Sequence, residues 1–302
     1  MNNPSKAPLA VVTVTYSPGE YLDAFAASIP EATERDVLLV MADNGSVDGS
    51  PEAAERRYQW AEFLPTGGNI GYGAAINCAV RSLKPRVERC EIDGEFFLIS
   101  NPDVLFSPGS IDALIDAASR HPGAASLGPY IKEEDGSAYP SARAVPTLGN
   151  GIGHALLSGV WPSNPWTRAY KADQDMTVEH EAGWLSGSCL LVRWDAFEAI
   201  GGFDERYFMY MEDVDLGDRF GRAGWSNVFV PSSVIEHAKG HVAGEHPELM
   251  LPVHHESAYR FQADRYPAVW HFPLRAALWL GLKCRATLAV ASARLRRTLR
   301  RN

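Results

Sequence analysis

The stretch LAVVTVTYSPGEYLDAFAASIPEATERDVLLVMADNGS, at residues 9–46, places an apolar β-branched run, a helical pattern and a second apolar run in succession. It predicts a strand at Leu9–Thr15, a helix near Glu20–Ser28 and a second strand at Val37–Ala42. Strands that alternate with helices are typical of a parallel sheet covered by helices. A helix is expected at Tyr72–Leu83 and a further short buried strand at Phe96–Ser100. The fold class that follows is α/β, with a Rossmann-like, mostly parallel sheet flanked by helices.

The chain has 302 residues, of which 46% are hydrophobic and 22% charged, so it can form a full core. The pattern weakens over residues 130–182, which are rich in Gly, Pro and Trp, and an irregular insert that shapes a second binding surface is expected there. Regular patterns return with a strand at Ser188–Arg193, a helix at Met211–Ala223 and a strand at Val228–Val230. We expect one α/β domain at residues 1–265, followed by a helical tail at residues 266–302.

The charge is divided unevenly along the chain. The formal net charge is −9, but the last 32 residues hold eight basic side chains and no acidic one, which leaves −17 for the rest. An acidic body argues against nucleic-acid binding, because phosphate contacts need Lys and Arg. The four cysteines lie far apart without a Cys-x-x-Cys pair, which argues against a zinc ribbon or a disulfide scaffold and suits a reducing cytosolic setting.

The tail predicts an amphipathic helix. At 100° per residue its basic side chains fall on one half of the helix, and the other half gathers apolar ones: Leu274, Ala277, Leu280, Cys284, Leu288, Ala291, Leu295 and Leu299. Such a helix suits an anionic membrane surface. The alternative is a helix packed on the domain with a solvated basic face, and Leu278, Trp279 and Leu282 break the clean division. No stretch reaches the roughly 18 to 20 apolar residues of a membrane span, and the N-terminus lacks a secretory signal.

Polar clusters follow the predicted strands, at the edge where open α/β sheets bind ligands. Thr15, Tyr16 and Asp43 could hold a nucleoside, with the base stacked on Tyr16, although Asp-Asn-Gly-Ser at 43–46 is also turn chemistry. The glycine-rich loop that contains Asn69 and Gly71 could bring backbone amides to a phosphate, and a plain tight turn is the alternative. It matches neither a Walker loop nor a dinucleotide fingerprint.

Asn101-Pro102-Asp103 comes directly after a buried strand and is a candidate metal site. Asp103 could ligate Mg²⁺ or Mn²⁺, which prefer oxygen ligands. Asn101 stands where a second carboxylate would strengthen the site. His237, at the end of a late strand, could be a further ligand, although a lone histidine is more often a packed or surface side chain.

The densest cluster spans residues 201–219 and holds three carboxylates within four positions: Glu212, Asp213 and Asp215. Acidic residues also favour a helix N-terminus, which is the structural alternative. Crowding like charges beneath Tyr207, Phe208 and Tyr210 should raise a carboxyl pKa and prepare a general base.

In their order along the chain, these clusters resemble those of the inverting family 2 glycosyltransferases of the GT-A fold. The series is Val-Thr-Tyr at 14–16, Ala-Asp-Asn-Gly-Ser at 42–46, Asn-Ile-Gly-Tyr-Gly at 69–73, Asn-Pro-Asp at 101–103, Trp-Leu-Ser-Gly-Ser at 184–188, and Gly-Gly-Phe-Asp-Glu from 201 with Met-Glu-Asp-Val-Asp-Leu at 211–216. It covers most of residues 9–240 and is specific as an ordered set. The resemblance implies a GT-A catalytic domain at residues 1–265.

The resemblance also implies a role for each matching residue. Thr15, Tyr16 and Asp43 would hold the nucleoside, and Asn69, Gly71 and Asn101 would lie along the donor. Asp103 and His237 would ligate Mg²⁺ or Mn²⁺ on the donor diphosphate. Asp213 would be the catalytic base, with Glu212 and Trp184 near the acceptor sugar. Asn101 departs from the usual Asp-x-Asp pattern, which puts tight metal binding in question.

Within the family the sequence is most similar to actinobacterial rhamnosyltransferases that build the linker between peptidoglycan and arabinogalactan. That similarity implies dTDP-L-rhamnose as donor and N-acetylglucosaminyl-diphospho-decaprenol as acceptor. A lipid acceptor implies a cytoplasmic protein that is peripheral on the inner face of the plasma membrane, with the tail on the anionic surface. The alternatives are a transferase with another nucleotide sugar, a nucleotidyltransferase, and a non-catalytic module that binds nucleotide sugars or membranes.

Overall fold

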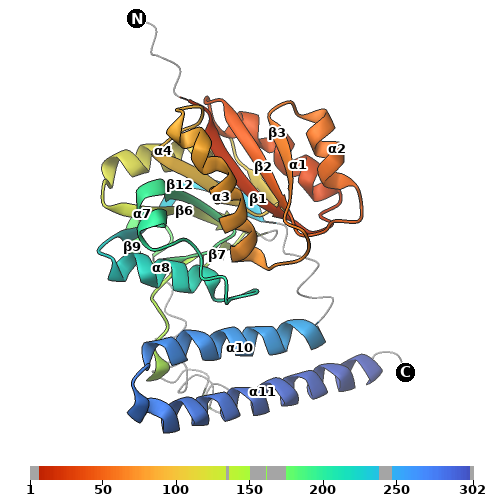
Figure 1. The fold of residues 1–302 in the computed structure, drawn as a ribbon, viewed down its shortest axis with the longest axis vertical. Coiled ribbons are helices and arrows are strands. Elements are labelled where there is room, and N and C mark those ends of the chain that lie inside the picture. Colours follow the sequence, from red (N-terminus) through yellow and green to blue (C-terminus); the bar gives the residue numbers. More distant parts are fainter. Residues whose placement is uncertain (1–6, 134–135, 150–160, 162–174, 238–246, 300–302) are drawn as a thin grey trace, which may run out of the picture.

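The computed structural model describes residues 7–133, 136–149, 161, 175–237 and 247–299. It has a mixed sheet between two layers of helices, and a helical hairpin lies below these layers in the view of Figure 1. The strand order in the main sheet is β3-β2-β1-β4-β11-β6-β12-β5. The strands on this path are β1 (Leu9–Thr15), β2 (Val37–Asp43), β3 (Ala61–Pro65), β4 (Phe96–Ser100), β5 (Val104–Phe106), β6 (Ala124–Lys132), β11 (Cys189–Arg193) and β12 (Ser226–His237).

Alternate side chains of the strands face opposite layers of helices. Leu9 and Val11 of β1 belong to one core cluster, and Ala10 and Val12 belong to the other. The first cluster is covered by α1 (Glu20–Ala32), α2 (Ser50–Arg57) and α4 (Ser110–Arg120), and the second by α3 (Tyr72–Glu88), α7 (Trp194–Ala199) and α8 (Glu212–Arg222). The α/β class and the flanking helices agree with the sequence analysis.

Two helices and one strand are longer than their sequence patterns indicate. The first helix continues past Ser28 to Ala32 although it contains Pro30, and α3 continues to Glu88 through Pro85. Both prolines are exposed and lie in the last four residues of their helices, and the burial of neighbouring side chains such as Ile29 and Ala32 offsets the backbone hydrogen bond that a proline removes. The strand expected at Val228–Val230 lies in the first half of the 12-residue β12, whose register shifts between Val230 and Val234.

The polar clusters meet at one edge of the sheet because of the strand directions. β1 is parallel to both β2 and β4, so these three strands end side by side at Thr15, Asp43 and Ser100. β11 is antiparallel to β4 and therefore begins at the same edge. β5 is antiparallel to β12, with His237 opposite Val104, and this pairing brings the end of β12 beside Asp103.

The segment expected to be irregular contains short strands that attach it to the sheet. β7 (Ala138–Tyr139) pairs with β6, and β9 (His180–Ala182) pairs with β12. β8 (Ala142–Arg143) and β10 (Trp184–Leu185) form a separate two-stranded ribbon. Much of this insert, residues 150–160 and 162–174, lies outside the described residues.

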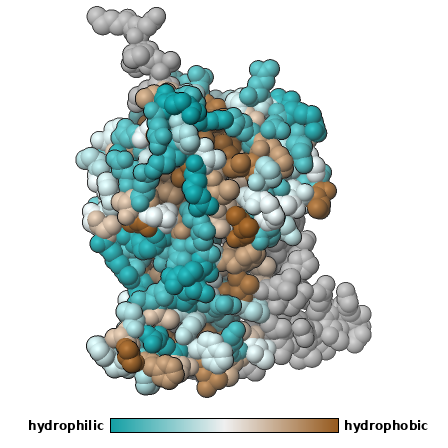
Figure 2. Space-filling model, in the orientation of Figure 1, coloured by the Kyte–Doolittle hydropathy of each residue, from teal (hydrophilic) through white to brown (hydrophobic). Residues whose placement is uncertain are grey.

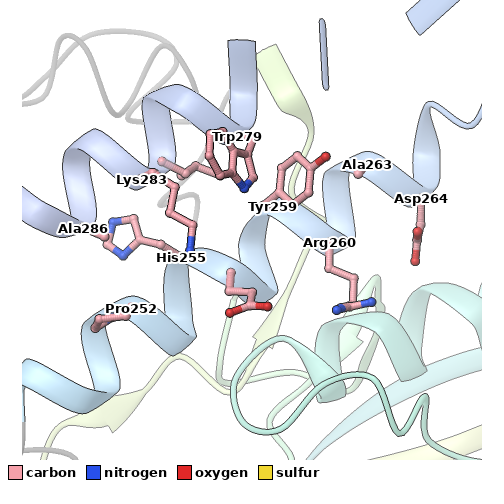
Figure 3. A pocket seen from close by; sticks show the side chains of 11 residues that line it. Pro252, His255, Tyr259, Arg260, Ala263, Asp264, Trp279, Lys283 and Ala286 are labelled. Carbon is pink, nitrogen blue, oxygen red and sulfur yellow. The ribbon is translucent and has the colours of Figure 1, made fainter. Parts of the chain in front are cut away.

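The tail pairs with a helix that the sequence analysis does not anticipate. α10 (Pro247–Arg265) and α11 (Phe272–Leu299) are joined by the 3-10 turn η1 (Val269–His271) and lie antiparallel below the α/β domain (Figure 1). Trp279 and Lys283 of α11 point toward His255 and Tyr259 of α10 across a cavity of about 210 Å³ (Figure 3).

The hairpin leaves part of the expected apolar face of the tail uncovered. Leu282 and Ala286 line the cavity against α10, whereas Ala277, Leu280 and Cys284 are exposed. The side chains of the tail from residue 288 onward, which include five of its eight basic residues, lie outside the described side chains. None of the described helices is both long and apolar enough to cross a membrane.

Candidate active site

A cavity of about 600 Å³ lies at the edge of the sheet where β1, β2 and β4 end. We call it the strand-edge cavity. Its lining combines aromatic and amide side chains with one carboxylate near the sheet: Val14, Tyr16, Ser17, Pro18, Gly19, Glu20, Tyr21, Asn44, Asn69, Tyr72, Asn101, Pro102, Asp103 and Met209. Its size is that of a typical small-molecule site.

The first predicted cluster divides between this cavity and the turn beneath it. Tyr16 is 52% exposed and lines the cavity, whereas Thr15 and Asp43 are buried. The carboxylate of Asp43 accepts hydrogen bonds from Thr15 Oγ1 at 2.7 Å, from Ser46 Oγ, and from the amides of Gly45 and Ser46 at 3.0 Å each. These contacts are the turn chemistry named above as the alternative, and a direct contact of Thr15 or Asp43 with a nucleoside stays a prediction.

The glycine-rich loop places Asn69 in the cavity and packs Gly71 against another segment. Gly71 has φ 91°, and a Cβ there would lie 2.6 Å from the carbonyl oxygen of Phe208. The amide of Gly71 donates to Asn69 Oδ1 at 3.2 Å, and that of Tyr72 donates to Phe208 O at 3.1 Å. Close packing therefore explains this glycine, and these two amides are already paired within the protein.

The candidate metal ligands come together as the sequence analysis expects. Asp103 Oδ1 lies 3.1 Å from His237 Nε2, and Asn101 Nδ2 lies 3.4 Å from the same nitrogen. Adjacent ligands of an octahedral cation are separated by about 3 Å, so Asp103 and His237 fit one divalent ion. The described residues contain no cluster of three or more His, Cys, Asp or Glu side chains suited to a metal. Two protein ligands leave coordination positions for donor phosphates and water.

A second cavity, of about 290 Å³, lies at the N-terminus of α8. We call it the acidic cavity. Carboxylates, an aromatic wall and two basic side chains meet in it, and its lining is Tyr139, Arg143, Ala144, Val145, Pro146, Trp184, Tyr210, Met211, Glu212, Asp213, Val214 and His254.

Two backbone amides hold the carboxylate of Asp213. Gly187 N donates to Oδ2 at 3.0 Å and Val214 N donates to Oδ1 at 2.8 Å. The Tyr72 hydroxyl donates to Gly187 O at 2.8 Å and so fixes the peptide that carries one of these donors. Burial raises the pKa of Asp213, although both hydrogen bonds and the charge of Arg143 oppose the rise.

Glu212 shares the cavity with Asp213 but has fewer partners. Its Oε2 is buried and has no hydrogen-bond partner among the described residues. Burial, and then the charge of Asp213, raises the pKa of Glu212 to about 8. Near neutral pH the pair therefore holds a proton, and the hydrogen bonds on Asp213 favour that residue as the charged member.

Asp215, the third carboxylate of the cluster, has a different role. It is buried and forms an ion pair of 2.6 Å with Arg219, which also donates to the carbonyl oxygens of Ile200 and Gly202. It does not line the acidic cavity. The ion pair therefore ties α8 to the turn after α7 and leaves two carboxylates for chemistry.

The start of α8 is held in a strained conformation. Tyr210 and Met211 each have φ 67°, which is unusual for residues with a side chain. Buried Tyr207 packs against Val214 and Phe261 just below them. This packing holds Glu212 and Asp213 at the mouth of the cavity.

Trp184 forms one wall of the acidic cavity. It lies against Gly217 of α8, where an added Cβ would be 2.7 Å from the Trp184 Cβ, and its indole Nε1 donates to Ala144 O at 3.2 Å. The ring is thus fixed beside Asp213, in the region where an acceptor sugar was expected.

Sequence reasoning missed three residues that line the two cavities. Asn44 was considered only as part of a turn, Arg143 lies in the segment without a regular pattern, and His254 lies in the unanticipated helix α10.

Comparison with known proteins agrees with this architecture. Residues 10–201 match the family model "Glycosyl transferase family 2". The chain is 52% identical, over 97% of its length and 96% of the relative, to N-acetylglucosaminyl-diphospho-decaprenol L-rhamnosyltransferase of Mycobacterium tuberculosis. It is 28% identical to rhamnosyltransferase WbbL of Escherichia coli, over 72% of this chain and 82% of the relative.

A solved structure supports the fold independently of close sequence similarity. Mannosyltransferase PcManGT from Pyrobaculum calidifontis, in complex with GDP-Man and Mn²⁺, superposes with a TM-score of 0.54 at 16% identity and covers 97% of this chain and 81% of its own. The chain therefore belongs to glycosyl transferase family 2 and is a glycosyltransferase with the GT-A fold.

Proposed function

We propose that the protein transfers L-rhamnose from dTDP-L-rhamnose to N-acetylglucosaminyl-diphospho-decaprenol with inversion at the anomeric carbon. The observation that carries this proposal is the 52% identity to the mycobacterial enzyme of that name, which extends over 97% of the chain rather than over the α/β domain alone. The strand-edge cavity suits a donor nucleotide, and the acidic cavity suits the acceptor sugar.

Asp213 is the catalytic base in this proposal. It removes a proton from the acceptor hydroxyl while that oxygen attacks the anomeric carbon from the face opposite the leaving nucleoside diphosphate. Gly187 N and Val214 N orient the carboxylate, and Trp184 supplies a flat apolar face for the sugar ring. Glu212, with its raised pKa, holds a proton and hydrogen-bonds to the acceptor.

The donor lies in the strand-edge cavity. Tyr16 stacks on the base, Asn69 and Asn101 contact the sugar nucleotide, and the turn built on Thr15 and Asp43 positions Tyr16. Asp103 and His237 hold a divalent cation, Mg²⁺ or Mn²⁺. When bound, that cation neutralises the charge that develops on the leaving diphosphate.

A lipid acceptor requires contact with a membrane, and the hairpin provides a suitable surface. At its tip Val269, Trp270 and Phe272 are 84%, 81% and 65% exposed. Figure 2 shows apolar surface along the lower edge of the molecule, where the hairpin lies. Exposed apolar side chains beside a segment of charge +8 are typical of a protein that binds an anionic membrane surface. The protein would then be peripheral on the cytoplasmic face, where nucleotide sugars are available.

The proposal is tested by offering the protein several donors with one acceptor. A synthetic N-acetylglucosaminyl-diphospho-prenyl lipid is incubated with the protein and Mg²⁺ or Mn²⁺, with dTDP-L-rhamnose or with UDP-linked sugars, and the lipid is analysed by mass spectrometry. The addition of one deoxyhexose from dTDP-L-rhamnose alone is expected. Transfer from another donor would support a different transferase, and nucleotide binding without any transfer would support the non-catalytic alternative.

A further inference from the structure

The acidic cavity contains an arginine that the reaction as described does not use. Arg143 is the last residue of β8, and it pairs directly with Trp184 of β10 in the antiparallel ribbon. Side chains of directly paired residues lie on the same face of a ribbon. Arg143 therefore lies next to the wall against which the acceptor sugar is expected to pack.

Arg143 lacks the partners that a structural arginine would have. Its Nε is buried without a hydrogen-bond partner, and no carboxylate of the described residues lies within ion-pair distance of its guanidinium. A buried N–H of a charged group is costly to leave unpaired. Among the partly buried arginines in the described part of the chain, Arg35, Arg219 and Arg265 each form an ion pair, Arg275 donates to the carbonyl oxygens of Tyr266 and Pro267, and Arg260 has no ion pair. A guanidinium with an unused donor beside an open cavity is suited to bind an anion.

A second basic side chain enters the same cavity from the hairpin. His254 of α10 lines the cavity, and its ring packs against Tyr210 with the centroids 5.3 Å apart. Burial, and then the positive charges of His255 and Arg285, lower the pKa of His254, so this imidazole acts near neutral pH as a hydrogen-bond donor rather than as a cation. His255, its neighbour, faces the separate cavity between the two helices (Figure 3).

The acidic cavity therefore combines carboxylates and an aromatic ring with two basic side chains, and one of these, His254, belongs to the hairpin whose tip exposes Val269, Trp270 and Phe272. A lipid-linked sugar diphosphate likewise combines a sugar, an anion and a hydrocarbon chain.

We propose that Arg143, together with His254, binds the diphosphate of the lipid-linked acceptor, which makes Arg143 a specificity-determining residue for that class of acceptor. This inference rests on the proposed function, because it assigns one part of the proposed acceptor to one part of the cavity. The guanidinium donates hydrogen bonds to the phosphate oxygens, and the imidazole of His254 donates a further one.

The test compares two acceptors that share the sugar and differ in the anion. One is a short-chain N-acetylglucosaminyl-diphospho-prenyl lipid, and the other is an alkyl glycoside of N-acetylglucosamine without phosphate. The variant is Arg143→Gln, and the control is Arg57→Gln, which removes an exposed arginine of α2. We expect kcat/KM for the diphosphate acceptor to fall about 10- to 100-fold in Arg143→Gln, as for the loss of charge-assisted hydrogen bonds, with less than a threefold change for the glycoside. Arg57→Gln should change neither.

An equal loss on both acceptors would overturn the proposal, because it would show that Arg143 acts through Asp213 or through the fold. The pH dependence of kcat tests separately whether Arg143 acts through Asp213. If it does, the loss of its charge in Arg143→Gln shifts the acid limb of the kcat profile on both acceptors. If Arg143→Gln does not fold, as judged by its melting temperature, His254→Gln is used in the same comparison.

Failure of the proposed function is separable from failure of this inference. Binding of the diphosphate acceptor is measured calorimetrically without any donor, on the full chain and on Arg143→Gln. Weaker binding by the variant supports the diphosphate site even if rhamnose is not the sugar transferred. Equal binding by both proteins rejects the site, whatever donor is used.

Discussion

Two neighbouring carboxylates, Glu212 and Asp213, share one cavity and differ in their hydrogen bonds. Two amides stabilise the charge of Asp213, whereas Glu212 has a buried oxygen without a partner among the described residues. The sequence places both at the start of a helix beside Asp215, and only the resemblance to family 2 glycosyltransferases singles out Asp213 as the base. The tertiary structure does so by pairing Asp215 with Arg219.

We expect Asp213→Asn to slow turnover by about 10²- to 10⁴-fold, since the amide cannot accept the proton of the acceptor hydroxyl. Donor affinity, measured by titration with the nucleotide, should be unchanged because the strand-edge cavity does not include this residue. Asp116→Asn, on the exposed side of α4, is the matched control. Full turnover by Asp213→Asn would remove this residue as the base.

The pKa of Glu212 predicts how stability depends on pH. Because the pKa is raised from its ordinary value to about 8, the folded state binds more protons than the unfolded state between about pH 4.5 and 8, and stability falls as the pH rises through that window. Glu212→Gln removes the ionisable group, so this contribution to the fall in stability with rising pH is absent from the variant. We expect its melting temperature to exceed that of the parent by about 2 to 5 °C at pH 8, and by less at pH 5. If the difference in melting temperature between Glu212→Gln and the parent is the same at pH 5 and pH 8, the raised pKa of Glu212 is contradicted.

At the scale of elements, the contact between the start of α3 and the segment before α8 joins the two cavities. Gly71 lies against Phe208 with the two backbones in contact, and the segment continues through the strained Tyr210 and Met211 into α8. The glycine-rich loop is recognisable in the sequence. The partner of Gly71 is not, because it lies more than 130 residues away.

We expect Gly71→Ala to destabilise the protein more than Gly67→Ala, by at least about 1 kcal/mol. The two glycines have similar φ, 91° and 88°, so the backbone strain is matched, but only the Cβ at position 71 meets another backbone, at 2.6 Å. Urea unfolding of both variants measures the difference. Turnover should fall in Gly71→Ala but not in Gly67→Ala, because the Cβ added at position 71 displaces Phe208 and thereby moves the start of α8. Equal losses of stability would show that strain, not packing, requires glycine at position 71.

At the scale of the whole molecule, the hairpin has an exposed apolar tip, whereas the α/β domain is acidic. Replacing both Val269 and Trp270 by Ser should lower binding to vesicles with anionic lipid about tenfold, since both side chains would leave the interface. The control is Val47→Ser, because Val47 is 92% exposed but lies in the α/β domain. Co-sedimentation with vesicles measures binding, and unchanged binding of the tip variant would mean that the tip does not enter the membrane.

The sequence by itself determined the parts of this protein that depend on local periodicity. Alternating apolar runs and helical patterns defined the first strands and helices, and parallel strands bring their polar ends to one edge, so the strand-edge cavity was foreseeable from Tyr16, Asn69 and Asp103. Helix ends were less predictable, because α1 and α3 continue past Pro30 and Pro85, and burial of neighbouring side chains such as Ile29 and Ala32 outweighs the backbone hydrogen bond that a proline removes.

Only the tertiary structure decided which distant residues share a cavity. The pairing of β5 with β12 places His237 beside Asp103, and the β8–β10 ribbon places Arg143 beside Trp184. α10 adds His254 from a segment whose pattern predicted no helix. These contacts are long-range, and their geometry depends on burial and strand register that no local pattern specifies. For the same reason, the physical difference between the three adjacent carboxylates, which the resemblance alone did not explain, lies in what each one contacts after folding.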